Sequence, residues 1–219
     1  MSNFYIPTTT LDREVLEKEL LRFLLVRTAA VRCGEKPGEL LRVNRVYTWQ
    51  DSEGEVVRYS QRKVLSLLQL PYCVLRTDER GSLILFYHPQ KLSATLRNEW
   101  HLQFLSRFGF PAEGGLAQYL KILQKRFAEV YLPHEVGIFL GYPLKDVVGF
   151  IQNAPKVPVR GRWQVFGNPR ESLRKMELYR SIEVYAETIL ETFYDIETCL
   201  EKITQINPAH WKETYSCKM

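Results

Sequence analysis

Apolar residues of the first thirty positions recur with helical spacing. Leu16, Leu20 and Leu24 follow one another at four-residue steps after a Thr-Leu-Asp-Arg-Glu opening, and Gly34 stops the pattern. This spacing predicts an amphipathic helix over residues 10–31. The glycines and the proline of "CGEKPGELLRV" then predict a tight loop.

The middle of the chain carries its clearest strand signal. The stretch "YCVLRTDERGSLILFYH" holds two β-rich runs joined at Asp78-Glu79-Arg80-Gly81, which is typical of a hairpin. The flanking apolar runs predict a short helix over 39–42 and a ragged hairpin over 47–59. With stops at Pro71 and in "GFPAEGG", they also predict helices over 60–70, 90–108 and 116–129.

The second half begins with "PHEVGIFLGYPLKDVVGFI", which combines an apolar run with three glycines. We expect a strand over 136–140, a turn at Gly141 and Tyr142, and a helix that begins at Pro143. "GRWQVFG" predicts another strand. After an Asn168 cap, apolar residues at steps of three and four predict a long helix over 169–205, with a seam formed by Ile182, Ala186, Ile189, Phe193, Ile196, Leu200 and Ile203.

This order of elements lacks the regular strand-helix alternation of a doubly wound sheet. It favours an α+β fold, with a small, mostly antiparallel or mixed sheet covered by helices and a long C-terminal helix. A chain of 219 residues with 45% hydrophobic and 25% charged residues is suited to one core, so we expect a single domain over 1–219.

Composition indicates the cellular location of the protein and the kinds of site that its cysteines allow. The apolar runs are shorter than a membrane span and the N-terminus has no signal-peptide pattern, which predicts a cytoplasmic protein without membrane contact. The four cysteines lack C-x-x-C or Cys/His spacing, so neither disulfides nor a metal site is expected. The cofactor question stays open.

The net charge of +5 is unevenly distributed: residues 156–180 hold seven basic and two acidic residues, and residues 181–219 hold seven acidic and three basic. One basic stretch forms a candidate patch for an anion or a partner, made of Arg160, Arg162, Arg170, Arg174 and Lys175 around Trp163. A solvated surface explains the same pattern. Single-stranded nucleic acid is the weakest interpretation, because one aromatic residue makes a poor stacking platform.

The turn at Gly141 gives the stronger site argument. A helix beginning at Pro143 directs free N–H groups and a positive dipole end toward whatever lies above the turn, which suits a carboxylate or phosphate. Tyr142 lies at the edge of such a site, and Asp146 falls in the first helical turn. The alternative is that the glycines only allow close packing and that Asp146 favours the helix dipole.

His134 and Glu135 suggest a zinc-protease motif, but that motif needs a second histidine at position 138, which is Ile138. His134 is then an acid/base group or a lone ligand with Glu135 beside it, or a structural histidine. The loop with Cys33 and Lys36 would add a thiol and a cation if it folds over the site.

The motifs together resemble an uncharacterised domain-of-unknown-function family found mainly in anaerobic Firmicutes. The resemblance rests on Pro133-His134-Glu135, Gly137, Phe139-Leu140-Gly141-Tyr142-Pro143, Asp146-Val147, Gly149-Phe150-Ile151, Gly161, Trp163, Val165, Gly167-Asn168, and a Gly-x-Lys-Pro element at Cys33-Gly34-x-Lys36-Pro37. It implies a link to flavodoxin and iron-uptake proteins through genomic setting, and no established reaction. The loop "APKVPVRGRW" lacks the cysteines that many relatives carry there, so a cysteine-based metal or redox role does not transfer.

Two hypotheses follow. In the first, a small molecule or anion binds at the turn over 134–146, with His134, Glu135, Gly141, Tyr142, Asp146, Lys36 and Trp163 as candidate ligand-binding residues. In the second, the basic patch and the C-terminal helix form a non-enzymatic interaction module that dimerises or binds an acidic protein such as a flavodoxin. A polar pocket at His134 and Tyr142 favours the first hypothesis, and an exposed Ile189-Phe193-Ile196 stripe favours the second.

Overall fold

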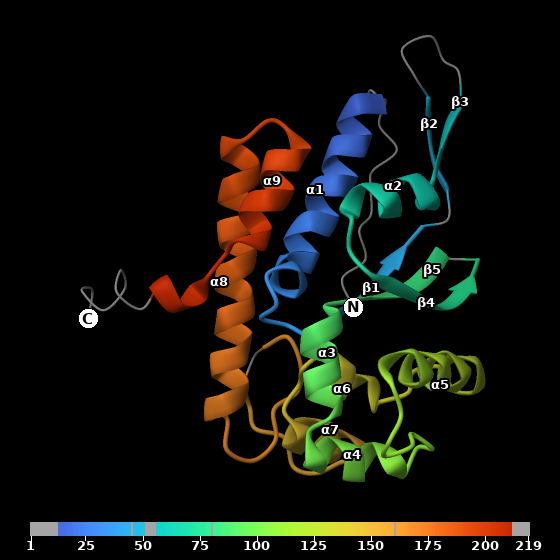
Figure 1. The fold of residues 1–219 in the computed structure, drawn as a ribbon, viewed down its shortest axis with the longest axis vertical. Coiled ribbons are helices and arrows are strands. Elements are labelled where there is room, and N and C mark those ends of the chain that lie inside the picture. The colour runs from blue at the N-terminus through green and yellow to red at the C-terminus, as the bar shows by residue number, and fades with distance from the viewer. Residues whose placement is uncertain (1–12, 45, 51–55, 80, 160, 212–219) are drawn as a thin grey trace.

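The computed structural model describes residues 13–44, 46–50, 56–79, 81–159 and 161–211 (Figure 1). Their elements are, in chain order, α1 (Arg13–Arg32), β1 (Gly38–Val43), β2 (Val46–Gln50), β3 (Val56–Ser60), α2 (Gln61–Leu68), β4 (Tyr72–Asp78), β5 (Gly81–Tyr87), α3 (Pro89–Leu96), α4 (Glu99–Ser106), α5 (Leu116–Glu129), α6 (Val136–Phe139), α7 (Leu144–Ile151), α8 (Arg170–Thr192), α9 (Ile196–Thr204) and a 3-10 turn (Pro208–Trp211).

A three-stranded antiparallel sheet in the order β1-β5-β4 forms the centre of the fold. Its β4–β5 hairpin is the one predicted from the sequence, and Asp78 pairs with Gly81 at its tip. A separate two-stranded sheet pairs β2 with β3, as predicted for 47–59, while the turn at 51–55 lies outside the described residues. Helices cover the small sheet, so the predicted α+β class is confirmed.

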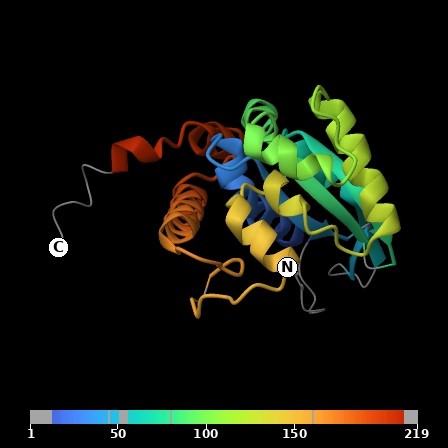
Figure 2. The ribbon, with the colours of Figure 1, turned by 90° about the horizontal axis from the view of Figure 1, so that it is seen from below.

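Both faces of the sheet are buried because β5 sends alternate side chains to two cores. Ile84 and Phe86 enter a cluster with α1, α2, α8 and α9, whereas Leu83 and Leu85 enter a cluster with α3 to α7. Figure 1 shows α1, α2 and α9 above the sheet and α3 to α7 below it, while the long α8 passes beside both groups. Figure 2 gives the view from below, with α3 to α7 toward the viewer. Double burial explains why residues 83–86 of β5 are consecutively apolar and do not alternate with polar residues.

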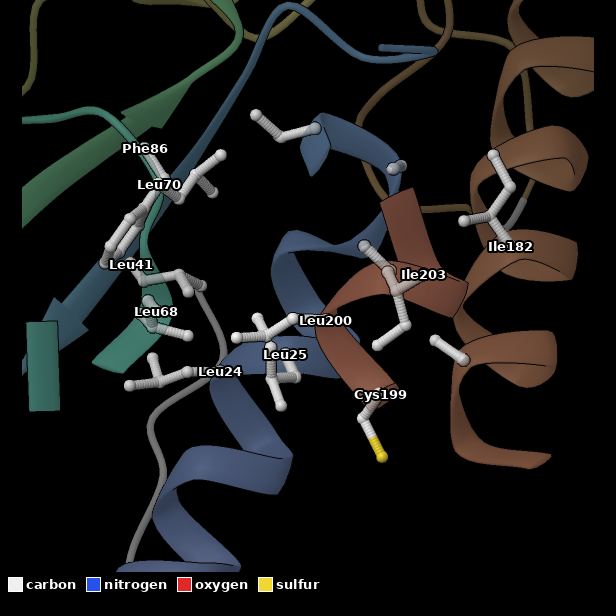
Figure 3. Packing of buried hydrophobic residues seen from close by; sticks show 14 of the residues in the cluster. Leu24, Leu25, Leu41, Leu68, Leu70, Phe86, Ile182, Cys199, Leu200 and Ile203 are labelled. Carbon is white, nitrogen blue, oxygen red and sulfur yellow. The ribbon is translucent and has the colours of Figure 1, made fainter. Parts of the chain in front are cut away.

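The first cluster joins elements that are far apart in the sequence (Figure 3). Leu24 and Leu25 of α1 point toward side chains from the sheet, from α2 and from the C-terminal helices, and each is at most 1% exposed. Leu200 and Ile203 of α9 close the cluster from the other side. The C-terminal helices therefore complete this core and are not an appendage to it.

Two predicted elements have the wrong secondary structure. Residues 39–42 were expected to be helical but belong to β1, because six consecutive residues pair with β5. Residues 136–140 were expected to form a strand, but Val136–Phe139 is the short helix α6. A five-residue buried apolar run fits either conformation, so periodicity does not separate them.

Other predicted elements are interrupted. The helix expected over 90–108 is two helices, because the Asn98 side chain accepts hydrogen bonds from Trp100 N and His101 N and starts α4. "GRWQVFG" makes one isolated bridge, between Lys156 and Phe166, in place of a strand. The helix expected over 169–205 ends at Thr192, and Asp195 caps the separate α9 through Thr198 N. Local capping thus overrides a continuous apolar pattern.

Among the described helices, none has the length and apolarity required to cross a bilayer.

Candidate functional site

The segment from Glu135 to Pro143 forms a buried corner between α6 and α7. Gly141 has φ +76°, and a Cβ added there would lie 2.6 Å from Pro37 Cδ and 3.1 Å from the Tyr179 hydroxyl. Only glycine fits both constraints. The Lys36-Pro37 loop therefore packs directly on this turn, and Pro143 lies at the N-cap of α7, one residue before the predicted position.

A cavity of about 480 Å³ opens beside this corner. It lies between α1, the start of β1, the α6–α7 segment and the loop that precedes α8. Its lining mixes charged, aromatic and apolar side chains: Arg27, Lys36, Glu39, Leu40, Leu132, His134, Val136, Gly137, Leu140, Tyr142, Asp146, Val147, Phe150, Arg162, Trp163 and Gln164. Five of the seven predicted ligand-binding residues are in this lining.

Asp146 anchors one side of the cavity through four donors. Its Oδ1 accepts hydrogen bonds from Lys145 Nζ at 2.7 Å and Phe166 N at 2.9 Å, and its Oδ2 accepts from Trp163 Nε1 at 2.8 Å and Ser172 Oγ at 2.6 Å. Burial opposes ionisation of Asp146, but the hydrogen bonds outweigh it and lower the pKa of the carboxyl. Asp146 is thus a satisfied anion that fixes the loop over α7.

Tyr142 and Trp163 form an aromatic stack at the cavity. Their ring centroids are 4.3 Å apart with an interplanar angle of 19°, and the bond to Asp146 fixes the orientation of the indole. Burial is the main cause that raises the pKa of Tyr142 to about 12, so its phenol is neutral at physiological pH. Beyond it, Tyr179 lies 6.4 Å from Trp163 and beneath the Lys36 ammonium, which is 5.0 Å from the Tyr179 ring centroid.

A network that we call the charged corner joins Arg27, Lys36, Glu39, Arg162 and Glu183. Glu39 Oε1 accepts from Arg27 at 2.9 Å and Glu39 Oε2 pairs with Lys36. Glu183 of α8 lies 3.4 Å from Arg27 and binds both terminal nitrogens of Arg162, one of them at 2.7 Å. Three cations and two carboxylates therefore meet here, and all except Glu183 line the cavity.

His134 and Glu135 separate. His134 is exposed at the cavity and packs edge-on against Phe150, with centroids 4.8 Å apart. Glu135 is 1% exposed and its carboxylate accepts from Arg126 Nε of α5 at 2.6 Å, an interaction that raises the pKa of Arg126. Glu135 is therefore part of the scaffold, and the two residues do not share a ligand in this arrangement.

The described members of the predicted basic patch make different contacts. Arg162 belongs to the charged corner, whereas Lys175 donates to the Gly141 carbonyl at 3.1 Å from beneath the turn. Arg170 and Arg174 are exposed on α8, and Arg160 lies outside the described residues. Arg162 and Lys175 therefore have partners within the protein, whereas Arg170 and Arg174 are exposed, and the patch stays a prediction.

Sequence reasoning missed Arg27, Glu39 and Glu183. Arg27 follows Leu20 by seven and Leu24 by three residues, so its place beside the apolar stripe of α1 was a usable signal. Glu39 was hidden by the wrong helix at 39–42. Glu183 has no local signal, because it lies 21 residues after Arg162 and more than 140 residues after Arg27, Lys36 and Glu39.

The described residues show no metal-binding group and no activated thiol at the cavity. Within the described part of the chain, no three His, Cys, Asp or Glu residues are grouped closely enough to hold a metal ion. Cys33 does not line the cavity, and burial raises the pKa of its thiol to about 11, so the thiol is protonated at neutral pH.

Comparison with known proteins identifies a family. No curated protein and no solved structure matches the chain significantly. A family model described as "Protein of unknown function (DUF3793)" matches residues 24–200, which include every residue of the charged corner and of the aromatic stack. The match spans most of the chain and agrees with the resemblance seen in its motifs. The chain therefore belongs to the DUF3793 family.

Proposed function

We propose that this protein binds a small organic molecule in the cavity between α1, β1, α6 and α7. The observation that supports this most is that the charged corner and the Tyr142–Trp163 stack border the same cavity. Ligand sites in proteins combine an apolar wall with a few placed polar groups in a volume of roughly 300–1,000 Å³. Here Leu132, Val136 and Phe150 provide part of the apolar wall.

The competing interaction module receives less support from the same geometry. Ile189 is 6% exposed, and Phe193 and Ile196 pack against the core cluster that α1 and α9 form. The stripe proposed for docking is thus engaged inside the molecule. A flavodoxin-like partner, a homodimer and a role in anaerobic redox or iron physiology stay predictions.

Two related dyes test the proposal, because they differ by one charged group. The probes are 8-anilinonaphthalene-1-sulfonate and its uncharged parent, N-phenyl-1-naphthylamine. We expect at least one of them to bind the folded protein in a saturable, one-to-one manner, measured by fluorescence titration. Near-ultraviolet circular dichroism establishes that the protein is natively packed, since this sulfonate also binds molten globules.

Two matched variants assign the dye to the cavity. Phe150→Ala removes a ring that lines the cavity and is 39% exposed, and Leu173→Ala removes a side chain of 40% exposure on α8, away from the lining. We expect Phe150→Ala to weaken dye binding about fivefold or more and Leu173→Ala to leave it unchanged. Failure of both dyes to bind, or equal losses in the two variants, contradicts the proposal.

A further inference from the structure

We infer that the ligand is an amphiphilic organic monoanion whose acidic group binds in the charged corner, in competition with the carboxylate of Glu39. This inference rests on the proposed function and specifies its ligand class. It follows from the charge count, from the coordination of Glu39 and from the apolar lining.

The charge count shows one positive charge in excess. Arg27, Lys36 and Arg162 carry three positive charges, and Glu39 and Glu183 carry two negative ones. The count covers the five residues of the charged corner. Asp146, which also lines the cavity, pairs with Lys145 and does not alter it. Lys36 is only 4% exposed, so water screens the excess charge poorly. One further negative charge would balance the corner.

Glu39 already shows how a carboxylate binds there. One of its oxygens accepts from the Arg27 guanidinium of α1, and the other pairs with the Lys36 ammonium from the loop before β1. A guanidinium and an ammonium that hold separate oxygens are typical of a carboxylate-binding site. Glu39 borders the cavity, so the acidic group of a ligand would reach the same cations and share or replace its contacts.

The corner is also incompletely satisfied. Arg27 Nε is buried and has no acceptor among the described residues, although its terminal nitrogens bind two carboxylates. In an ion-pair cluster that serves only structure, buried donors are normally hydrogen-bonded, because each unpaired donor lowers the free energy of unfolding. A rearrangement of Glu39 on ligand binding would allow this guanidinium to be paired differently.

The rest of the lining indicates that the part of the ligand outside its acidic group is apolar or aromatic. Leu132, Val136, Leu140, Val147 and Phe150 offer apolar contacts, and the Tyr142–Trp163 stack adds aromatic surface. A strongly hydrated ion such as inorganic phosphate would leave this surface uncovered. An organic acid with one anionic group and an apolar or aromatic body complements both parts of the cavity.

The two dyes separate this inference from the proposed function, because they share one ring system and differ in the sulfonate. We expect the wild-type protein to bind the sulfonate about tenfold or more tightly than the neutral parent, since a unit charge beside partly buried cations is weakly screened. Equal affinities for the two dyes overturn the monoanion class and leave the proposed function intact. If neither dye binds, the proposed function itself fails.

Two variants test residues of the charged corner, and a third serves as the control. Arg27→Gln should remove most of the preference for the sulfonate, measured as the ratio of its affinity to that of the neutral dye. Glu39→Gln should tighten sulfonate binding about tenfold, because the competing charge is gone while the side-chain shape is kept. Arg180→Gln, at an exposed position of α8, should change neither affinity.

Thermal unfolding of each variant establishes that it is folded before its affinities are compared. If Glu39→Gln is folded and binds the sulfonate no more tightly than the wild type, Glu39 is an organiser of the site and the competition is disproved. If Glu39→Gln is not folded, Glu39→Asp provides the second measurement. Its shorter side chain should release one cation and still tighten sulfonate binding, and unchanged or weaker binding overturns the inference.

Discussion

Two buried carboxylates border the cavity, and they are held in different ways. Asp146 is 2% exposed and binds one ammonium and three neutral donors, so its charge is balanced and both oxygens are satisfied. Glu39 is 6% exposed and binds two cations in a group that keeps one excess positive charge. A balanced, saturated anion stabilises a scaffold, whereas an unbalanced group of charges is suited to a ligand.

The largest effect should come from Asp146→Ala. The change removes the acceptor of three neutral donors, namely Phe166 N, Trp163 Nε1 and Ser172 Oγ. The Lys145 ammonium keeps its bonds to Phe166 O and Ser172 Oγ but loses its buried counter-ion. Breaking a buried ionic network in this way typically costs about 3–5 kcal/mol of unfolding free energy. Urea denaturation measures it, with Glu171→Ala at an exposed position of α8 as the control. A cost below about 1 kcal/mol would show that the network is not a scaffold.

An intermediate loss of stability is expected at the Gly141 turn, which packs against the Lys36-Pro37 loop of the charged corner and precedes α7, the helix that carries Asp146. Gly141→Ala places a methyl group against Pro37 on a backbone with φ +76°, which should destabilise the protein by about 1–3 kcal/mol. Gly115→Ala is the control, because a Cβ at Gly115 meets no atom within 4 Å. Both are measured by urea denaturation. Equal stability of the two variants would mean that the Lys36-Pro37 loop adjusts freely, contrary to the close packing inferred here.

Elements whose structure is decided by neighbouring residues were predicted correctly, and elements decided by distant contacts were not. The β4–β5 hairpin was predictable because strand residues and turn residues stand together in one short stretch. The strand β1 was missed because "GELLRV" is compatible with a helix, and its pairing with β5 decides the outcome from more than forty residues away. The helix α6 was missed because all of its residues are buried, which removes the periodicity that distinguishes a helix from a strand.

The residues of the candidate site likewise fall into those that local motifs indicate and those that only tertiary contacts bring to the cavity. Lys36, His134, Tyr142 and Trp163 were identified from motifs, because glycines, prolines and aromatic residues mark unusual backbone and close packing. Glu135 was placed with them only by its neighbour His134, and its true partner is Arg126. The ion pair of Arg162 with Glu183 could not be predicted, since side-chain geometry selects this half-buried acid among the five glutamates of α8.

The smallest stability effect, and the sharpest test of the contrast between the two carboxylates, should come from Arg162→Gln. The Arg162 and Glu183 side chains are 25% and 13% exposed, so solvent weakens their attraction and the loss should stay below about 1 kcal/mol in urea denaturation. Arg174→Gln, which is exposed on the same helix as Glu183, provides the baseline.

The same variant should nevertheless bind the sulfonate dye several times more weakly, because one of three cations is lost from the cavity. Arg162→Gln would then change dye affinity more than stability, whereas the effect expected for Asp146→Ala is a large loss of stability. If Arg162→Gln instead destabilises the protein as much as Asp146→Ala and leaves dye affinity unchanged, the charged corner is a second scaffold. Its ion pairs would then stabilise the junction of α1, β1 and α8, and its excess positive charge would not mark a ligand site.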